Sequence, residues 1–196
     1  MVWFKKNVSW IVLNFPALVM FGALCINPSL WEPLTPYTGY ISLALLVTVL
    51  ALNPLQSLIP TSILIKKINR YRRQVGVAVL SYAFVHVLCF YLKRDGLMDF
   101  LQYFLHPAII PGLLALIIFI PLAITSNNSL VKKMGFMKWK KLHKFAYLAE
   151  WLLVLHLFFV GSFLYAGLIF TPLMVLQYLR RRKRKHQLCN SLAQGV

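Results

Sequence analysis

Acidic side chains are scarce in this 196-residue chain, which has four Asp and Glu residues against 21 Lys and Arg residues. Polar sequence is also scarce, because 60% of the residues are hydrophobic. In a soluble protein a net charge of +17 would suggest a nucleic-acid partner. Here the charges stand between long apolar runs. We therefore interpret them as topology signals and as contacts to membrane lipid, and we expect no nucleic-acid binding.

Cysteines are few, and the usual catalytic motifs are missing. Cys25, Cys89 and Cys189 have no CxxC spacing and are odd in number, so they give no signal of a zinc site, a redox motif or a disulfide framework. The sequence shows no Ser-His-Asp set, no paired catalytic carboxylates and no Gly-rich phosphate loop. It also has no room for an NAD(P)H or FAD domain. If the chain moves electrons, a separate donor must supply them.

The apolar residues gather in six runs. Each run is close to the length of about 20 residues that crosses about 30 Å of hydrocarbon as a helix. The sequence therefore predicts an all-α integral membrane protein, a six-transmembrane helix bundle that occupies residues 1–196 as a single domain. The predicted spans are Trp10–Ile26, Tyr40–Leu58, Gly76–Leu92, Phe104–Ile124, Leu142–Val160 and Phe163–Leu179.

The basic residues indicate how the spans are oriented. All but two of the 21 Lys and Arg residues fall at the N-terminus, in the 61–75 and 127–144 regions, or in the basic tail at 180–196. The exceptions are Lys93 and Arg94. Positively charged loops stay in the cytoplasm, so the sequence predicts that both termini are cytoplasmic. The predicted outer loops are 27–39 and 93–103.

Two histidines lie deep inside predicted spans. His86 is ten residues into the third span, about 15 Å from its cytoplasmic end, and His156 is twelve residues into the fifth, about 18 Å deep. A histidine inside a membrane is costly unless it has a partner. Two imidazoles at matched depth are what a haem iron with two axial ligands requires. The alternative is an ordinary interhelical hydrogen bond from each ring, and the depth match alone leaves both interpretations open.

A third histidine, His143, lies at the cytoplasmic edge of the fifth predicted span. It is about 20 Å from His156 along the axis of the predicted helix. A second haem at this level would find no histidine on the third span, where Arg72 and Arg73 stand instead. Those arginines could pair haem propionates or a phosphate. Spacing alone favours an interfacial histidine near lipid headgroups.

Glu150 is the only carboxylate inside a predicted span, seven residues after His143 and on nearly the same helix face. It could accept a proton, or it could form a salt bridge with a neighbouring Lys or Arg. The sequence leaves both interpretations open.

Several short motifs carry a resemblance to a known family. The most specific is the string G-x3-W-x2-L-H-x3-Y over residues 135–147, which His156 follows. With these residues the chain resembles the ferric reductase-like transmembrane family over about residues 35–160, and in particular its haem-binding subunits of periplasmic methionine sulfoxide reductase systems. The other matching residues are Thr38-Gly39, Asn53-Pro54-Leu55, Arg72-Arg73, Gly76, His86 and Thr125-Ser126.

The resemblance implies a b-type haem held by His86 and His156, with His143 also needed for haem or electron transfer. It leaves open a second haem at His143 and a bound FMN. It implies a multi-pass protein of the bacterial inner membrane that takes electrons from quinol or a cytoplasmic flavin reductase. The implied acceptor is a periplasmic, molybdopterin-containing catalytic subunit that reduces methionine sulfoxide in oxidised proteins. Unlike NADPH oxidases, the chain has no second histidine on its third span and no fused flavin domain.

Two other functions compete with this one. A ferric or other metal reductase would use the same haem with a different outer acceptor. A small transporter or a membrane scaffold would use the histidines for protons or for interhelical hydrogen bonds. A visible spectrum of the purified protein separates the haem hypotheses from the transporter hypothesis.

Overall fold

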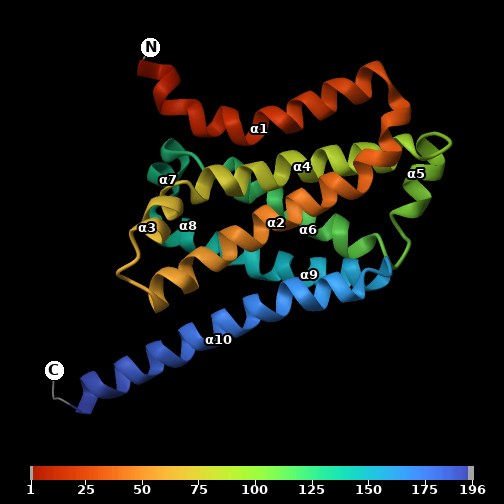
Figure 1. Ribbon diagram of the computed structural model, residues 1–196. Helices are drawn as coiled ribbons and strands as arrows, with labels where there is room; N and C mark the ends of the chain where they lie inside the picture. Colours follow the sequence, from red (N-terminus) through yellow and green to blue (C-terminus); the bar gives the residue numbers. More distant parts are fainter. Residues whose placement is uncertain (1, 194–196) are drawn as a thin grey trace.

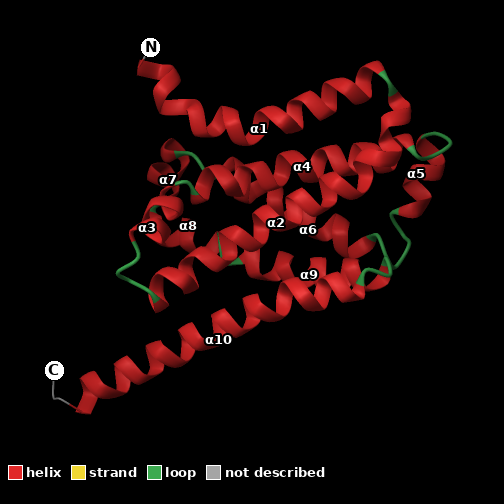
Figure 2. Cartoon of the chain, viewed as in Figure 1, coloured by secondary structure: helices red, strands yellow, loops and turns green. Residues whose placement is uncertain are grey.

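The computed structural model describes residues 2–193, and within that range it contains helices and no strand (Figure 2). This confirms the predicted all-α class. The elements are α1 (Val2–Ile26), η1 (Pro28–Leu30), α2 (Trp31–Leu58), α3 (Ile63–Arg70), α4 (Arg72–Leu92), α5 (Leu97–Tyr103), α6 (Ile110–Ile124), α7 (Asn128–Met134), α8 (Phe136–Leu142), α9 (Phe145–Phe159) and α10 (Phe163–Ala193).

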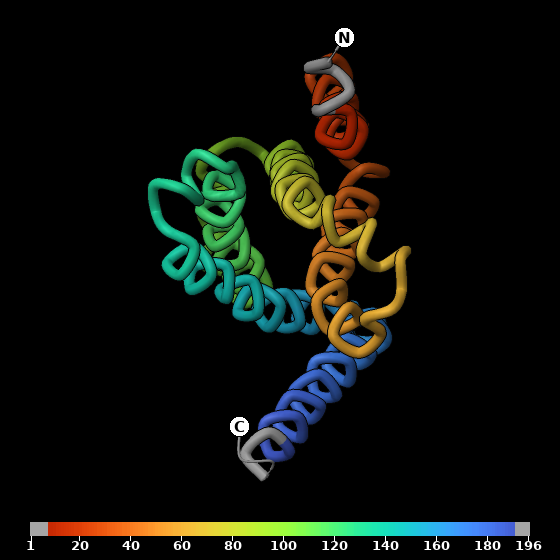
Figure 3. The backbone as a smooth tube through the Cα atoms, turned by 90° about the vertical axis from the view of Figure 1, so that its left-hand side faces the viewer, coloured from red at the N-terminus to blue at the C-terminus, as the bar shows by residue number. Residues whose placement is uncertain are grey.

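The long helices run back and forth, so both chain ends lie at the same end of the bundle (Figure 1). The short helices α3, α7 and α8 are found there too, and we call it the terminal end. Helix α5 lies at the opposite, distal end. Figure 3 views the bundle from the left-hand side of Figure 1. It shows α2, α4, α6 and α9 around the centre, with α1 and α10 outside them. Their packing agrees, because α2 contacts α4, α4 contacts α6, α6 contacts α9 and α10 contacts both α2 and α9.

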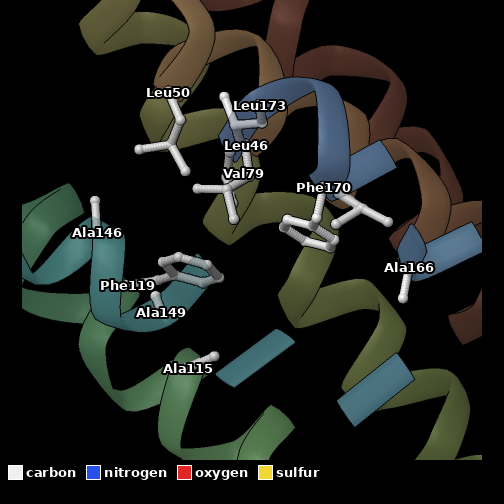
Figure 4. Close-up of a cluster of buried hydrophobic side chains, with 11 residues drawn as sticks. Leu46, Leu50, Val79, Ala115, Phe119, Ala146, Ala149, Ala166, Phe170 and Leu173 are labelled. Atoms are coloured by element: carbon white, nitrogen blue, oxygen red, sulfur yellow. The ribbon is translucent and has the colours of Figure 1, made fainter. Parts of the chain in front are cut away.

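Apolar side chains from five helices form the main core (Figure 4). Leu50 of α2 and Leu173 of α10 are fully buried in it, and Phe119 of α6 is 5% exposed. Small residues such as Ala149 allow α9 to approach its neighbouring helices closely, which is typical of helix packing in membranes. A second cluster, around Leu24, joins α1 to α4.

Within residues 2–193, five helices could cross a membrane, or six if one bent pair is a single span. That pair is α6 and α7, which meet at an angle of 92°. The predicted span Phe104–Ile124 is wrong at its start, because α6 begins at Ile110. Pro107 disfavours helix in the residue before it, and Pro111 fits the first turn of α6, where it removes no hydrogen bond. The five helical spans are Val8–Ile26, Pro28–Leu58, Arg72–Leu92, Phe136–Phe159 and Phe163–Asn190.

Other predicted boundaries also differ from the structure. The predicted loop 27–39 is mostly helix, because α2 already begins at Trp31, and the loop 93–103 contains α5. Hydropathy locates the ends of an apolar run, whereas a helix extends beyond those ends as long as its backbone groups can form hydrogen bonds. At His143 the opposite occurs: α8 and α9 are separated by two non-helical residues inside the predicted span Leu142–Val160.

Helix α10 is the longest element, with 31 residues, and it continues beyond the predicted end at Leu179. Its basic section packs against the end of α2. There Lys183 donates through Nζ to the carbonyl oxygens of Ser57 at 2.9 Å and Leu58 at 3.4 Å. A cation at these carbonyls complements the negative end of the α2 dipole. This contact ties the basic tail to the terminal end.

Candidate functional site

A cavity of about 410 Å³ lies among α2, α4, α6 and α9 towards the distal end, and we call it the distal cavity. His86 and His156 both line it, although they come from α4 and α9. Most of the remaining wall is apolar, for example Leu43, Leu113 and Leu153. The structure thus brings the two deep histidines to one apolar cavity of a size typical of cofactor sites.

The imidazole of His86 is held by the backbone of α2. Its Nδ1 lies 2.9 Å from the carbonyl oxygen of Thr35. A carbonyl can only accept, so Nδ1 carries the proton and Nε2 keeps its lone pair. The ring passes close to Gly39, one turn further along α2. A Cβ at that position would lie 3.1 Å from the ring atoms Nδ1 and Cε1.

The imidazole of His156 repeats this arrangement against the start of α6. Its Nδ1 lies 2.7 Å from the carbonyl oxygen of Ala108, just before that helix. Gly112 stands four residues after Ala108, and a Cβ there would lie 3.0 Å from Nδ1 of the ring. Each histidine therefore has a backbone acceptor for Nδ1, and each has a glycine that makes room for the ring. In both rings Nε2 is the nitrogen left to bind a metal.

Two such imidazoles suit a metal that brings its own equatorial ligands. Among residues 2–193 no group of three or more His, Cys, Asp or Glu side chains could hold a bare metal ion. A six-coordinate porphyrin iron takes two axial ligands, and two imidazoles line the distal cavity. Lys93 also lines this cavity and could pair an anionic substituent.

A second cavity, of about 550 Å³, lies towards the terminal end, and we call it the proximal cavity. His143, Trp139 and Tyr147 line it. Its wall is strongly basic, which makes it suitable for an anionic ligand such as a phosphate. The basic residues are Arg72, Arg73, Lys140, Lys144, Arg180, Arg181 and Arg184.

His143 is bonded differently from the two distal histidines. Its Nε2 lies 3.2 Å from the hydroxyl oxygen of Thr125, and that hydroxyl donates to the carbonyl oxygen of Pro121 at 2.6 Å. The hydroxyl proton is therefore used, so Nε2–H of His143 donates to Thr125. The ring also packs on Trp139, with the ring centroids 4.3 Å apart. The nitrogen that the distal histidines leave open is occupied here.

The two sequence-predicted arginines have separate contacts at the cavity wall. Arg72 donates from Nε to the carbonyl oxygen of Val49 at 3.1 Å, which joins α4 to α2. Arg73 lies over Trp139, 5.3 Å from the ring centroid, and donates to Asn128 at 2.6 Å. The wall of the proximal cavity thus contains a cation that stacks on an aromatic ring, with further positive charges beside it.

The two cavities share one wall residue, Phe119, and a buried carboxylate lies beside them. Glu150 is 0% exposed. Its carboxylate accepts two hydrogen bonds from Nε2 of Gln177, at 3.0 Å and 2.9 Å. The observed partner of Glu150 is thus an amide, and the salt bridge with Lys or Arg, one of the two interpretations from sequence, is not observed among these contacts.

Lys93, Gln177 and Arg180 are wall residues whose role sequence reasoning missed. Lys93 had been interpreted only as one of the two outer charges, and Arg180 only as part of the basic tail. Their place in the cavities depends on helix packing, which charge patterning does not describe. The signal that could have indicated Gln177 is its polarity inside an apolar run.

Membrane-length helices around an apolar cavity that two histidines line define a multi-span membrane protein. The chain belongs to the ferric reductase-like transmembrane family, whose family model, "Ferric reductase like transmembrane component", matches residues 38–154. This confirms the resemblance on which the sequence prediction relied, and it supports a role in electron transfer at a membrane.

Relatives of two kinds are similar to this chain. The heme-binding subunit MsrQ of protein-methionine-sulfoxide reductase from Polaromonas naphthalenivorans is 27% identical, over 99% of this chain and 98% of that protein. MsrQ from Herminiimonas arsenicoxydans is 33% identical, over 74% of this chain and 69% of that protein. The magnetosome protein MamZ from Magnetospirillum gryphiswaldense is 34% identical over 61% of this chain, which spans only 18% of MamZ. No solved structure shows a significant match.

Proposed function

We propose that this chain is a b-type cytochrome of the bacterial inner membrane that passes electrons to a methionine sulfoxide reductase. The observation that carries the proposal is the pair of histidines at the distal cavity, each with Nδ1 bonded to a backbone carbonyl. The acceptor would be a periplasmic catalytic subunit with a molybdopterin cofactor, and the substrate would be oxidised methionine in periplasmic proteins. The similarity to MsrQ over nearly the whole chain supports this choice.

The distal cavity has the properties that a haem site requires. His86 and His156 would be the axial ligands through Nε2, and the apolar wall would cover the faces of the macrocycle. Lys93 would pair a propionate, because it is the one Lys or Arg among the residues that line this cavity. A haem held by two imidazoles supplies reversible one-electron chemistry with no open position for a substrate. The chain's own contribution is to fix the ring orientation and the tautomer of both ligands.

The proximal cavity would be the place where electrons enter. An FMN phosphate would pair with Arg72, Arg73 and the neighbouring basic residues, and its ring would stack on Trp139. A quinol head could use the same aromatic wall without the phosphate. The bond from Nε2 of His143 to Thr125 favours a flavin or quinol over a second haem, since that nitrogen is not available to iron.

The orientation of the chain follows from charge in this proposal. The terminal end carries the basic proximal cavity and the basic tail, so it would face the cytoplasm, with both termini. Cysteines introduced in 127–141 should then resist a membrane-impermeant reagent added from outside, and cysteines in 93–103 should react. Labelling of the 127–141 segment alone would reverse the orientation and would place the basic cavity on the outer side.

The decisive experiment is a visible spectrum of the purified protein with quantitation of bound haem. We expect a low-spin, six-coordinate b-type spectrum, and we expect it to be absent from a protein in which His86 and His156 are both changed to Ala. The double variant should still insert in the membrane, because the change removes two polar groups from apolar helices. A wild-type protein that binds no haem would overturn the proposal and would favour a transporter or a scaffold.

A second candidate function, a ferric or other metal reductase, rests on the family relationship, because the family is named after ferric reductases. It uses the same distal cavity and differs only in the outer acceptor. The two are separated by reducing the purified protein and mixing it with either a methionine sulfoxide reductase catalytic subunit or a ferric chelate. Fast reoxidation by the catalytic subunit alone supports the first function, and fast reoxidation by the chelate alone supports the second.

A further inference from the structure

Glu150 is a buried carboxylic side chain for which the proposed electron path gives no role. It lies on α9 between the two cavities. Tyr147, one turn before it, lines the proximal cavity, and Leu153, one turn after it, lines the distal cavity. The residue is 0% exposed. An ionised carboxylate in such a place is costly unless a partner compensates its charge, so the nature of its partner is informative.

The partner of Glu150 is an amide, which can serve both protonation states of the acid. In the observed arrangement Nε2 of Gln177 donates to both carboxylate oxygens. After rotation of the amide, its carbonyl oxygen can instead accept a hydrogen bond from the protonated acid. A Lys or Arg in this position would stabilise the ionised form alone. The Glu150–Gln177 pair therefore permits gain and loss of a proton at a buried site.

The other titratable and charged groups around this pair lie mainly on its proximal side. Tyr147 and His143 belong to the same stretch of chain, and Arg180 of α10 donates to the hydroxyl of Tyr147 at 3.4 Å. Arg72 of α4 lines the proximal cavity, and Tyr40 of α2 lines the distal one. Helix α6, which packs closely on α9, contains no titratable residue. Among the described hydrogen bonds, none joins Glu150 to a charged group.

We propose that Glu150 takes up one proton when an electron enters the distal site, and releases it when the electron leaves. This inference rests on the proposed function, in which a haem holds the electron. An added electron makes the low-dielectric interior more negative, which favours the neutral acid over the carboxylate. The electron comes from the quinol or reduced flavin donor, and the proton is one that the same donor releases into the proximal cavity when it is oxidised. One O–H or N–H bond of the donor breaks, and one O–H bond forms on Glu150. Gln177 lines that cavity, so rotation of its amide gives the proton access to Glu150.

The test is redox potentiometry of the haem-loaded protein over a series of pH values. The midpoint potential of the wild type should fall as the pH rises, because reduction consumes a proton. Glu150→Gln has nearly the same shape and cannot titrate, so it should lose this dependence. The matched control is Glu32→Gln, which changes an exposed carboxylate at the start of α2 and should keep it. Gln177→Lys should also lose it, because the ammonium would hold Glu150 ionised.

Infrared spectroscopy supplies a second measurement, which detects the protonated acid directly in the wild type. The reduced-minus-oxidised difference spectrum of the wild type should gain a carboxylic acid C=O band that shifts in D2O. Glu150→Gln should lack the band. A wild-type potential that does not change with pH would overturn the inference, and so would an unchanged slope in Glu150→Gln. If haem is bound by both histidines in that experiment, the proposed function stands and this inference alone fails. A protein without haem overturns both.

Discussion

The distal and proximal cavities use the same type of residue in opposite ways. In the distal cavity, His86 and His156 donate from Nδ1 to a backbone carbonyl and leave Nε2 open. In the proximal cavity, His143 uses Nε2 itself to bond a threonine hydroxyl. The walls differ as well, since the distal cavity has one Lys and the proximal cavity has seven Lys and Arg residues. The contrast supports the proposal of a haem site beside an anion-binding site, and each prediction below tests one side of it.

The largest effect is expected for the distal histidines. His86→Ala or His156→Ala should abolish the low-spin spectrum, because a six-coordinate iron loses one of its two protein ligands. His143→Ala should keep most of the distal haem. Pyridine haemochrome quantitation and the visible spectrum of each variant measure this difference. Equal haem loss in all three variants would mean that the two cavities are not distinct sites.

The next effect concerns the glycines beside the rings. Gly39→Ala and Gly112→Ala each place a Cβ about 3 Å from a histidine ring, so the ring must move away from its carbonyl acceptor. Loss of such a supporting hydrogen bond typically weakens metal binding by about 10- to 100-fold, and we expect a loss of haem affinity in this range. Haem titration of the apoprotein measures it.

The control for both substitutions is Gly167→Ala, on α10. A Cβ at Gly167 meets no atom within 4 Å, so haem affinity should not change. All three substitutions replace a glycine inside a helix with alanine, and each should favour the helical conformation by about 1 kcal/mol. A haem loss in the first two variants cannot then be attributed to a weaker helix. Haem affinity unchanged in Gly112→Ala would contradict the close approach of His156 to α6.

A kinetic effect is expected for His143→Ala. The substitution removes the hydrogen bond to Thr125 and the packing on Trp139, which together shape the proximal wall. Reduction of the distal haem by a quinol or by reduced flavin should become slower, while the equilibrium haem content changes little. Stopped-flow absorbance follows this reduction. A rate equal to that of the wild type would show that electrons do not enter through the proximal cavity.

The smallest effect is expected for a single proximal arginine. Arg73→Gln removes one of several positive charges and its stacking on Trp139. One charge-assisted hydrogen bond contributes about 1.5–3 kcal/mol, so FMN should bind roughly tenfold more weakly or worse. Fluorescence quenching of FMN measures the change, and riboflavin, which lacks the phosphate, should be affected less. An equal loss for both ligands would mean that Arg73 contacts the ring and not the phosphate.

Much of the distal site could be predicted from the sequence, because depth along a membrane helix is simple to calculate. His86 and His156 lie on helices that enter from the same end, so similar residue counts place them at nearly one level. Their acceptors could not be predicted in this way. Thr35 and Ala108 contribute main-chain carbonyls, and a main-chain carbonyl leaves no signal in the identity of its residue.

The proximal site was harder to predict because it is assembled from distant segments. Arg72 and His143 were expected near each other, but Arg180 and Gln177 come from a helix that had been interpreted as an anchor with a basic tail. Helix boundaries failed for a related reason. The interruption at His143 and the late start of α6 at Ile110 are backbone features inside predicted spans, and hydropathy responds to side chains.

The use of main-chain acceptors has a consequence for how this protein tolerates sequence variation. Every amino acid has the same backbone carbonyl, so substitution at Thr35 or Ala108 leaves the acceptor of each ring in place. Gly39 and Gly112 have no such freedom, because any Cβ meets the imidazole. In a saturation library selected for haem content, positions 35 and 108 should therefore be permissive, whereas 39 and 112 should return glycine. The information that specifies the site is concentrated in two histidines and two glycines.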